Sequence, residues 1–348
     1  MLKTIKQIFR LKDWWNHIFP PILGIAYLGV LLNQIEVKMV WSKLLMFFIS
    51  FLFTAAFGFF LNDIFDIEID RKVGKTNFAK RFSKSTRVLM IIIVVVGSII
   101  PWIYLDHRLG FIVFILQMIL LIVYSSPPIR LKNFSVLSVI TDAFYSSLLP
   151  SIIAVLLFVP ISMNLIHYNY GLSLLLIVMF FRGLRNILIH HIKDIENDKN
   201  SNSGNFAVKY GSNTTIKLLK VITLIESFVY IIFLIYFTYF CNIWFVVLIP
   251  ISLLYFVSKR FDSANKSNLV TDHMQILNDL YEDIFPLFIL ILLAFFDNYF
   301  IILLIIHLIL FRNKMLIFLL HLIFIRIAYG IIYRKSCGLI NRICKTNF

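Results

Sequence analysis

The sequence predicts an all-α protein, a polytopic membrane helical bundle with nine core transmembrane helices and an extra apolar C-terminal segment. Hydrophobic residues make up 60% of the 348 residues, and the chain contains 36 Phe. The mean hydropathy of +0.89 lies far above the range of soluble proteins. About 20 mostly apolar residues suffice to cross a bilayer, and runs of this kind recur along the chain.

The nine predicted spans follow one another in order, with polar connections between them. They cover residues 14–32, 40–61, 88–105, 111–124, 136–159, 171–189, 215–240, 243–257 and 281–296. Two further apolar stretches, 299–311 and 315–333, follow Asp297 and Asn298. The first is short for a span, so a fused, tilted helix over 281–311 is the arrangement that best satisfies the topology. We divide the chain into a helical bundle, 1–297, and a hydrophobic C-terminal segment with a basic tail, 298–348.

The positive charges predict which face of the membrane each loop occupies. The net charge is +15, with four Lys or Arg before Trp14 and seven within residues 71–87. The loops on the opposite face carry only three. By the positive-inside rule, the amino terminus and the loops before the odd-numbered spans face the cytoplasm, as expected in a cytoplasmic (inner) membrane. The basic tail belongs on the same face, which requires an even number of crossings, and ten fits best. Because this distribution follows topology, we expect membrane lipid as a partner and no nucleic acid.

The amino terminus and the cysteines indicate no processing or structural metal. No small-residue cleavage site follows the first apolar run, so we interpret this run as an uncleaved helix. Cys241, Cys337 and Cys344 lack C-x-x-C spacing. They therefore predict neither a disulfide framework nor a zinc site.

Four acidic residues follow the second span within the sequence NDIFDIEID, residues 62–70. A carboxylate close to hydrocarbon costs several kcal/mol unless a cation, a partner or water meets it. Asn62, Asp66 and Asp70 are four residues apart and share one helix face, with Asp63 at its edge. Glu68 is expected to point elsewhere.

A second acidic group follows the sixth span, in HHIKDIENDKN, residues 190–200. Asp194 and Asp198 repeat the four-residue spacing, and steps of four backwards reach His190, Asn186 and Arg182. Four spans separate the two groups, so both lie on the same face of the membrane. The equivalent positions hint at an internal structural repeat.

Two carboxylate groups with neighbouring Lys and Arg suit Mg²⁺ and a diphosphate. Mg²⁺ prefers oxygen ligands and usually binds through one or two carboxylates, water and substrate phosphate. A single group could equally be a solvated turn of mixed charge, but two groups at matching positions favour a site. A scaffold without chemistry would leave Asp66 and Asp194 freely replaceable.

These residues resemble the UbiA superfamily of intramembrane prenyltransferases. Asn62, Asp63, Asp66 and Asp70 match its N-D-x-x-D-x-x-x-D signature, and Asp194 and Asp198 match its D-x-x-x-D signature. The stretch YSSPPIRLK, residues 124–132, is similar to a loop after the fourth helix of several members. The resemblance covers most of residues 10–290 and implies a bundle around a cavity that is open to lipid and capped by the two acidic loops.

The resemblance also implies roles for individual residues. The Mg²⁺ ligands would be Asn62, Asp66, Asp70, Asp194 and Asp198, and these four aspartates are also the candidate catalytic residues. The candidate substrate-binding residues on this basis are Asn62, Asp63, Lys72, Tyr124, Arg130 and Lys132, and the steps of four back from Asp194 add Arg182 and His190. For Lys72, Arg130 and Lys132, topology anchors are an equally good interpretation, and His190 is better explained as a helix-end histidine bonded to backbone or water than as a catalytic base.

The implied function is a Mg²⁺-dependent intramembrane transferase. It moves a prenyl group from a prenyl diphosphate to a lipophilic or aromatic acceptor and releases diphosphate. One alternative uses phosphoribosyl diphosphate as donor and polyprenyl phosphate as acceptor. Another class, a secondary transporter, would place acids near the bilayer midplane, whereas these acids lie at helix ends.

The acceptor side departs from the family pattern. Several quinone-pathway members open the first helix with Arg-Pro, whereas this chain has LKDWWNHIFPP at residues 11–21. The acceptor therefore stays open among an aromatic quinone precursor, a porphyrin side chain and a glycerophosphate lipid. Asp142 is a lone acid in the fifth span, which either lines the cavity or is capped by the hydroxyls of Tyr145 and Ser146.

Overall fold

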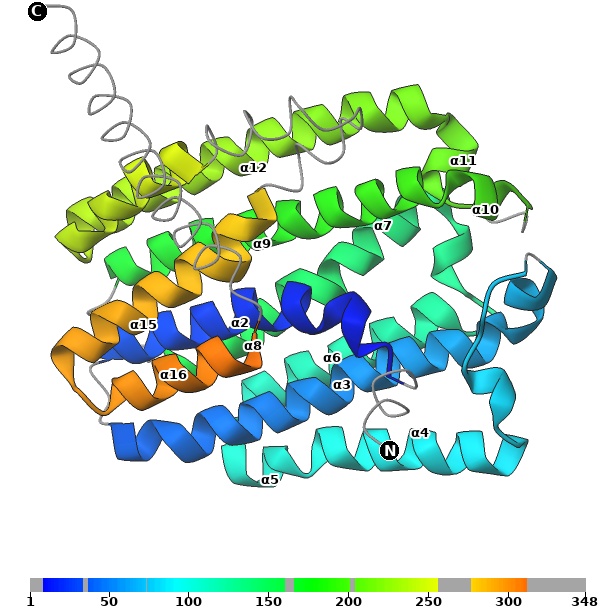
Figure 1. Cartoon of the computed structure of the whole chain (residues 1–348), viewed down its shortest axis with the longest axis horizontal. Helices are drawn as coiled ribbons and strands as arrows, with labels where there is room; N and C mark the ends of the chain where they lie inside the picture. Colours follow the sequence, from blue (N-terminus) through cyan, green and yellow to red (C-terminus); the bar gives the residue numbers. More distant parts are fainter. Residues whose placement is uncertain are drawn as a thin grey trace, which may run out of the picture.

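The computed structural model describes residues 9–33, 37–72, 74–159, 166–200, 204–255 and 277–311, and within these ranges it contains helices and no strands (Figure 1). The α-helices are α2 (Leu11–Asn33), α3 (Val37–Lys72), α4 (Lys84–Ile99), α5 (Pro101–Leu105), α6 (Arg108–Ser125), α7 (Ser135–Ala143), α8 (Leu149–Phe158), α9 (Ile166–Lys193), α10 (Ile195–Asn200), α11 (Phe206–Tyr210), α12 (Ser212–Phe240), α15 (Phe285–Phe296) and α16 (Phe300–Leu310). The all-α membrane bundle predicted from the sequence is confirmed.

Seven helical segments among the described residues are long and apolar enough to cross a membrane. They are 11–33, 40–72, 84–105, 108–125, 135–158, 169–193 and 212–240. The eighth predicted span forms the shorter helix Ile243–Tyr255. The ninth is helical over 277–296, with a π-helical turn at Leu280–Ile284 before α15. The total of nine core helices stays a prediction.

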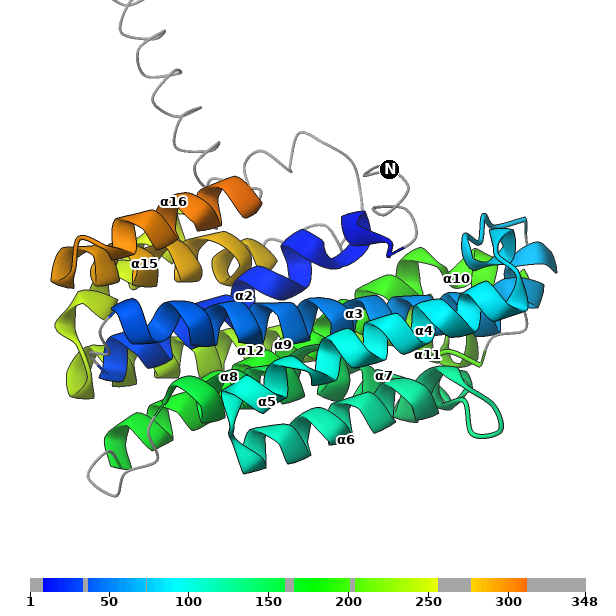
Figure 2. The same ribbon diagram turned by 90° about the horizontal axis from the view of Figure 1, so that it is seen from below.

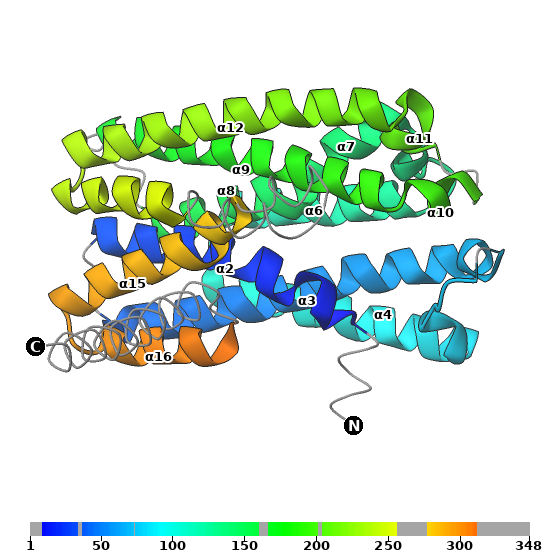
Figure 3. The ribbon, with the colours of Figure 1, turned by 45° about the horizontal axis from the view of Figure 1, so that its top comes forward.

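The long helices run roughly along one axis of the molecule, with α2 at the centre (Figures 1 and 2). α2 buries 14 of its 23 residues, and it packs against α8, α15 and the π-helical turn at 280–284. α9 packs along α12, and α3 packs along α4. Figure 3 shows these two pairs on opposite sides of the molecule, with the carboxyl ends of α3 and α9 at the same end. Helix order alone therefore brings the two acidic sequences to one end of the bundle.

The C-terminal part of the described chain corrects one prediction. A single fused helix over 281–311 does not form, because α15 ends at Phe296 and α16 begins at Phe300. The carboxylate of Asp297 accepts a hydrogen bond from the backbone N–H of Tyr299, at 3.0 Å, and α16 folds back along α15 (Figure 1). Trp15 Nε1 donates to the carbonyl of Leu310 at 2.7 Å, which ties α16 to α2. The predicted stretch 315–333 lies outside the described residues.

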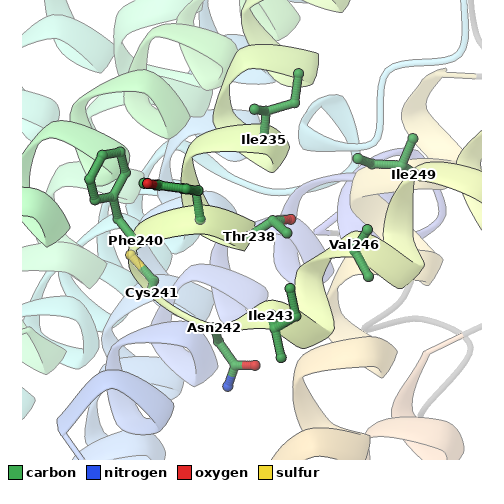
Figure 4. A pocket seen from close by; sticks show the side chains of 9 residues that line it. Ile235, Thr238, Phe240, Cys241, Asn242, Ile243, Val246 and Ile249 are labelled. Atoms are coloured by element: carbon green, nitrogen blue, oxygen red, sulfur yellow. The ribbon is translucent and has the colours of Figure 1, made fainter.

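A small cavity of about 510 Å³ lies where α12 ends and the helix Ile243–Tyr255 begins. Figure 4 shows its lining, which includes Ile235, Phe240, Cys241 and Val246. α12 is about 43 Å long at 1.5 Å per residue, so this cavity is remote from the acidic end of the bundle. Among the described residues its lining carries no charged side chain, and it does not suit a charged substrate.

Candidate active site

The first acidic group lies on the last turns of α3. This helix continues unbroken for 36 residues, about 54 Å, and so extends well past the roughly 30 Å of a hydrocarbon core. Asn62, Asp63, Asp66 and Asp70 all line one cavity of about 1700 Å³. Glu68 is 67% exposed and pairs with Arg71 at 2.9 Å outside that cavity. The helical spacing thus separates the four cavity residues from Glu68, as expected.

Two cations from the loop between α6 and α7 hold Asp66. Arg130 donates to its carboxylate at 2.5 Å, and Lys132 donates to both carboxylate oxygens at 2.5 and 2.6 Å. Lys132 also donates to Asn62 Oδ1 at 2.7 Å. Burial lowers the pKa of the Lys132 ammonium, although the charge of Asp66 opposes this. Asp66 is therefore neutralised by cations that reach it from a different loop.

The second acidic group continues the helical path of α9 into α10. The backbone N–H of Asp198 bonds to the carbonyl of Asp194 at 2.9 Å, so the four-residue spacing does place both on one face. Asn205, which caps α11 through Val208 N at 2.8 Å, also donates to the Asp198 carboxylate. Burial and the charge of Asp194 raise the pKa of Asp198.

The two acidic groups line the same cavity, with cations between them. Lys75 follows α3 in sequence, yet its ammonium pairs with Asp194 of the second group at 3.4 Å. Gly204 supports this closure, because a Cβ at this position would lie 2.0 Å from the carbonyl oxygen of Asn133. Only glycine lets the segment before α11 pack so closely on the loop that carries Lys132. Loops far apart in sequence thus form one continuous polar end of the cavity. We call this end the mouth, and it is lined by Asn62, Asp63, Asp66, Asp70, Lys75, Asn77, Arg130, Lys132, His190, Asp194, Asp198 and Asn205, with Arg10 at its edge.

A comparison with known families identifies this arrangement. The model of the UbiA prenyltransferase family matches residues 20–277, which is most of the chain. The protein belongs to the UbiA prenyltransferase family. No curated protein sequence is significantly similar to the chain.

Solved structures show the same fold for this UbiA chain. A UbiA homolog from Archaeoglobus fulgidus bound to GPP and Mg²⁺ matches with a TM-score of 0.63 and 18% identity. The match covers 82% of this chain and 98% of the homolog. The same homolog bound to DMAPP and Mg²⁺ matches with a TM-score of 0.60, 18% identity and the same coverage. At this identity the likeness concerns the fold.

The four remaining predicted site residues lie inside the cavity, at its mouth or outside it. Tyr124 lines the cavity, and its ring packs edge-to-face on Tyr145 with the ring centroids 5.1 Å apart. His190 lies near the mouth, 3.9 Å from Asp194, and Arg182 lines a deeper part of the cavity. Lys72 ends α3 as an exposed residue outside the cavity lining. A contact of Lys72 with substrate stays a prediction.

Four polar side chains of the mouth were not recognised from the sequence. Arg10 pairs with Asp63 at 3.2 Å, and Asn77 donates at 2.8 Å both to Asp70 and to the backbone carbonyl of Asp63. Lys75 and Asn205 hold the second group as described above. The stretch 71–87 contains seven Lys or Arg, and nothing in their spacing distinguishes Lys75. For Asn205 a signal did exist, since Asn is a favoured helix N-cap.

A buried ionic network lies deeper in this UbiA fold and was also missed. Arg185 of α9 binds Glu226 of α12 through two hydrogen bonds, at 2.6 and 3.0 Å, and both side chains are 0% exposed. Arg185 also donates to Asn278 at 2.7 Å. Arg182 pairs with Glu282 at 3.3 Å, on the π-helical turn that precedes α15. These charges cross-link α9, α12 and the segment before α15.

The donor groups of the mouth fit Mg²⁺ only in combination with a phosphate ligand. Within the described ranges, no three His, Cys, Asp or Glu side chains converge closely enough to hold a metal ion. Apart from Asp63, which pairs with Arg10, each half of the mouth supplies two carboxylates, Asp66 with Asp70 or Asp194 with Asp198. Mg²⁺ commonly takes one or two carboxylates from protein when phosphate and water complete its shell. The residues present therefore suit a metal that arrives with a diphosphate.

Proposed function

We propose that this UbiA-family protein is a Mg²⁺-dependent prenyltransferase that transfers a prenyl group from a prenyl diphosphate to a lipophilic or aromatic acceptor and releases diphosphate. One observation carries the proposal: two carboxylate groups and the cations Lys75, Arg130 and Lys132 line the same cavity. That cavity continues between α3, α6 and α9 toward apolar residues such as Phe51 and Leu121. A charged head and an apolar tail would thus both find a suitable surface.

Each part of the mouth has a role in this proposal. Asn62, Asp66, Asp70, Asp194 and Asp198 would hold Mg²⁺. When bound, Mg²⁺ would neutralise negative charge on the departing diphosphate. Arg130 and Lys132 would bind phosphate oxygens, since they already lie at the acids. Asp63 would support the site from its ion pair with Arg10. The structures of the homolog with GPP and Mg²⁺ and with DMAPP and Mg²⁺ support this type of donor.

Removal of the metal tests the proposal. Purified protein in lipid, given Mg²⁺ and geranyl diphosphate with a panel of acceptors, is expected to release diphosphate and to form a prenylated product seen by mass. Treatment with EDTA is expected to lower diphosphate release about 100-fold or more, and added Mg²⁺ to restore it, because the carboxylates alone repel the diphosphate. If no prenyl diphosphate yields diphosphate in the presence of Mg²⁺, the proposal is wrong.

The same assay separates the alternative donor. Phosphoribosyl diphosphate with polyprenyl phosphate replaces the prenyl donor and acceptor while protein, lipid and Mg²⁺ stay unchanged. The prenyltransferase proposal expects release from the prenyl donor alone. Release from the phosphoribosyl donor alone would assign the site to phosphoribosyl transfer.

A further inference from the structure

Asp142 is an acid that the diphosphate mouth does not use. It lies near the end of α7, inside the membrane-spanning segment Ser135–Phe158, and it lines the same cavity as the acidic groups. The hydroxyl of Tyr145 donates to one carboxylate oxygen, and the hydroxyl of Ser146 donates to the other at 3.3 Å. Asp142 therefore both lines the cavity and is bound by neighbouring hydroxyls, the two states that the sequence left open.

The local backbone holds this group in place. A π-helical turn at Phe144–Leu148 interrupts the fifth membrane-spanning segment next to Asp142, and such turns are frequent at functional sites. The carbonyl of Tyr145 accepts a hydrogen bond from Gln117 Nε2 of α6 at 2.9 Å. The ring of Tyr145 packs on Tyr124, whose side chain also lines the cavity. Three helical segments thus fix the carboxylate and its tyrosine partner.

The hydrogen bonds of Asp142 leave part of its capacity for a ligand. An ionised carboxylate offers about four acceptor positions, and two hydroxyls fill two of them. In the part of the chain that the structure describes, no Lys or Arg forms an ion pair with Asp142, whereas Asp66 and Asp63 are paired with cations. A carboxylate at membrane depth is costly unless a proton donor or charge meets it. An incoming hydroxyl group would supply such a donor.

We propose that Asp142 is the catalytic residue for the acceptor, and that the acceptor is a molecule with a hydroxyl group, either a phenol or an alcohol. This inference rests on the proposed prenyl transfer. The hydroxyl donates its hydrogen bond to the Asp142 carboxylate, and Tyr145 keeps that carboxylate oriented. The acceptor oxygen then forms the bond to the first carbon of the prenyl group. The bond between that carbon and the diphosphate oxygen breaks, its electron pair leaves with diphosphate, and the hydroxyl proton passes to Asp142.

The other acids and bases of the cavity are less suited to this role. Asp63 is paired with Arg10, and Asp66 with Arg130 and Lys132. Asp66, Asp70, Asp194 and Asp198 are also the proposed metal ligands, and a metal ligand cannot serve as a base at the same time. His190 lies at the mouth beside Asp194, with its side chain 63% exposed. Water therefore has access to its imidazole and competes with an acceptor for that base. Among the acids and bases that the structure describes, Asp142 alone combines a place inside the membrane-spanning part of the cavity with hydroxyl partners in place of cations.

The experiment compares acceptor transfer with donor binding in the same protein preparation. The hydroxyl-bearing probes are 1-naphthol, 4-hydroxybenzoate and sn-glycerol 1-phosphate, and the ethers 1-methoxynaphthalene and 4-methoxybenzoate are their matched controls. Asp142→Asn keeps the shape of the side chain and removes the base. It is expected to lower product formation about 100-fold or more, as loss of a general base does, while the Kd of the unreactive geranyl S-thiolodiphosphate with Mg²⁺ stays unchanged.

Further variants separate catalysis from structure. Asp142→Glu keeps a carboxylate and is expected to recover part of the lost transfer, and Glu68→Gln, an acid-to-amide change outside the cavity, is expected to transfer as wild type does. The inference is overturned if Asp142→Asn transfers within about threefold of wild type, if its donor binding falls together with transfer, or if wild type prenylates an ether or no hydroxyl probe. Failure of wild type to bind or cleave any prenyl diphosphate would instead refute the proposed function.

Discussion

Replacing Asp66 by alanine is expected to lower Mg²⁺-dependent diphosphate release about 100-fold or more. The change removes a carboxylate from the proposed metal site. It also leaves Arg130 and Lys132 without the anion that they contact at 2.5 Å. Because these two cations are largely buried, they have little water to replace it. Steady-state diphosphate release in lipid with saturating donor measures the effect.

Glu68→Ala is the matched control for Asp66→Ala, because both acids lie on the last turns of α3 only two residues apart. Glu68 pairs with Arg71 at the exposed surface, and such pairs contribute little. The rate of diphosphate release by Glu68→Ala is expected to stay within about twofold of wild type. Equal losses in the two variants would contradict the assignment of Asp66 to the site and of Glu68 to the outer face of α3.

The largest expected effect on stability comes from Glu226→Ala. This change removes the carboxylate that binds the fully buried guanidinium of Arg185 between α9 and α12 through two hydrogen bonds. Loss of one member of a buried ion pair typically costs about 3–5 kcal/mol, a large part of the 5–15 kcal/mol that stabilises an ordinary domain. Thermal unfolding of the variant in detergent micelles is expected to occur at a clearly lower temperature than that of wild type.

A double variant, Arg185→Met with Glu226→Met, tests the cause of this loss. Apolar residues of similar size often replace a buried ion pair without large cost. The double variant is therefore expected to be more stable than Glu226→Ala alone. A double variant that unfolds at the same or a lower temperature would show that packing, and not the lost ion pair, determines the loss.

The parts of the site that are readable from sequence are those set by helix geometry. Asp66 and Asp70 lie four residues apart on an unbroken helix, and Asp194 and Asp198 keep helical hydrogen bonding across the junction of α9 and α10. In such stretches, spacing alone determines which side chains share a face. The common location of both groups follows equally simply, from an even number of crossings between them.

The parts that could not be predicted depend on contacts between distant segments. Lys75 binds an acid 119 residues away, and Arg185 binds one 41 residues away, so no local spacing reveals either pair. The chain reversal at Asp297 could have been predicted, because Asp and Asn favour turns. The Asp297 carboxylate accepts a hydrogen bond from the backbone N–H two residues later, at Tyr299. The even number of crossings required by the basic tail outweighed that signal and favoured one continuous helix.

The contacts of Asp66 have a thermodynamic consequence. Two positive side chains, Arg130 and Lys132, bind this carboxylate, so a lone divalent ion must compete with them. A diphosphate offers those side chains another anion and so frees Asp66. Each ligand therefore strengthens binding of the other by the same factor, because linkage between two sites is reciprocal. Calorimetric titration of Mg²⁺ with and without an unreactive donor would reveal this cooperativity as two different affinities, and equal affinities would show that the carboxylate binds each ligand independently.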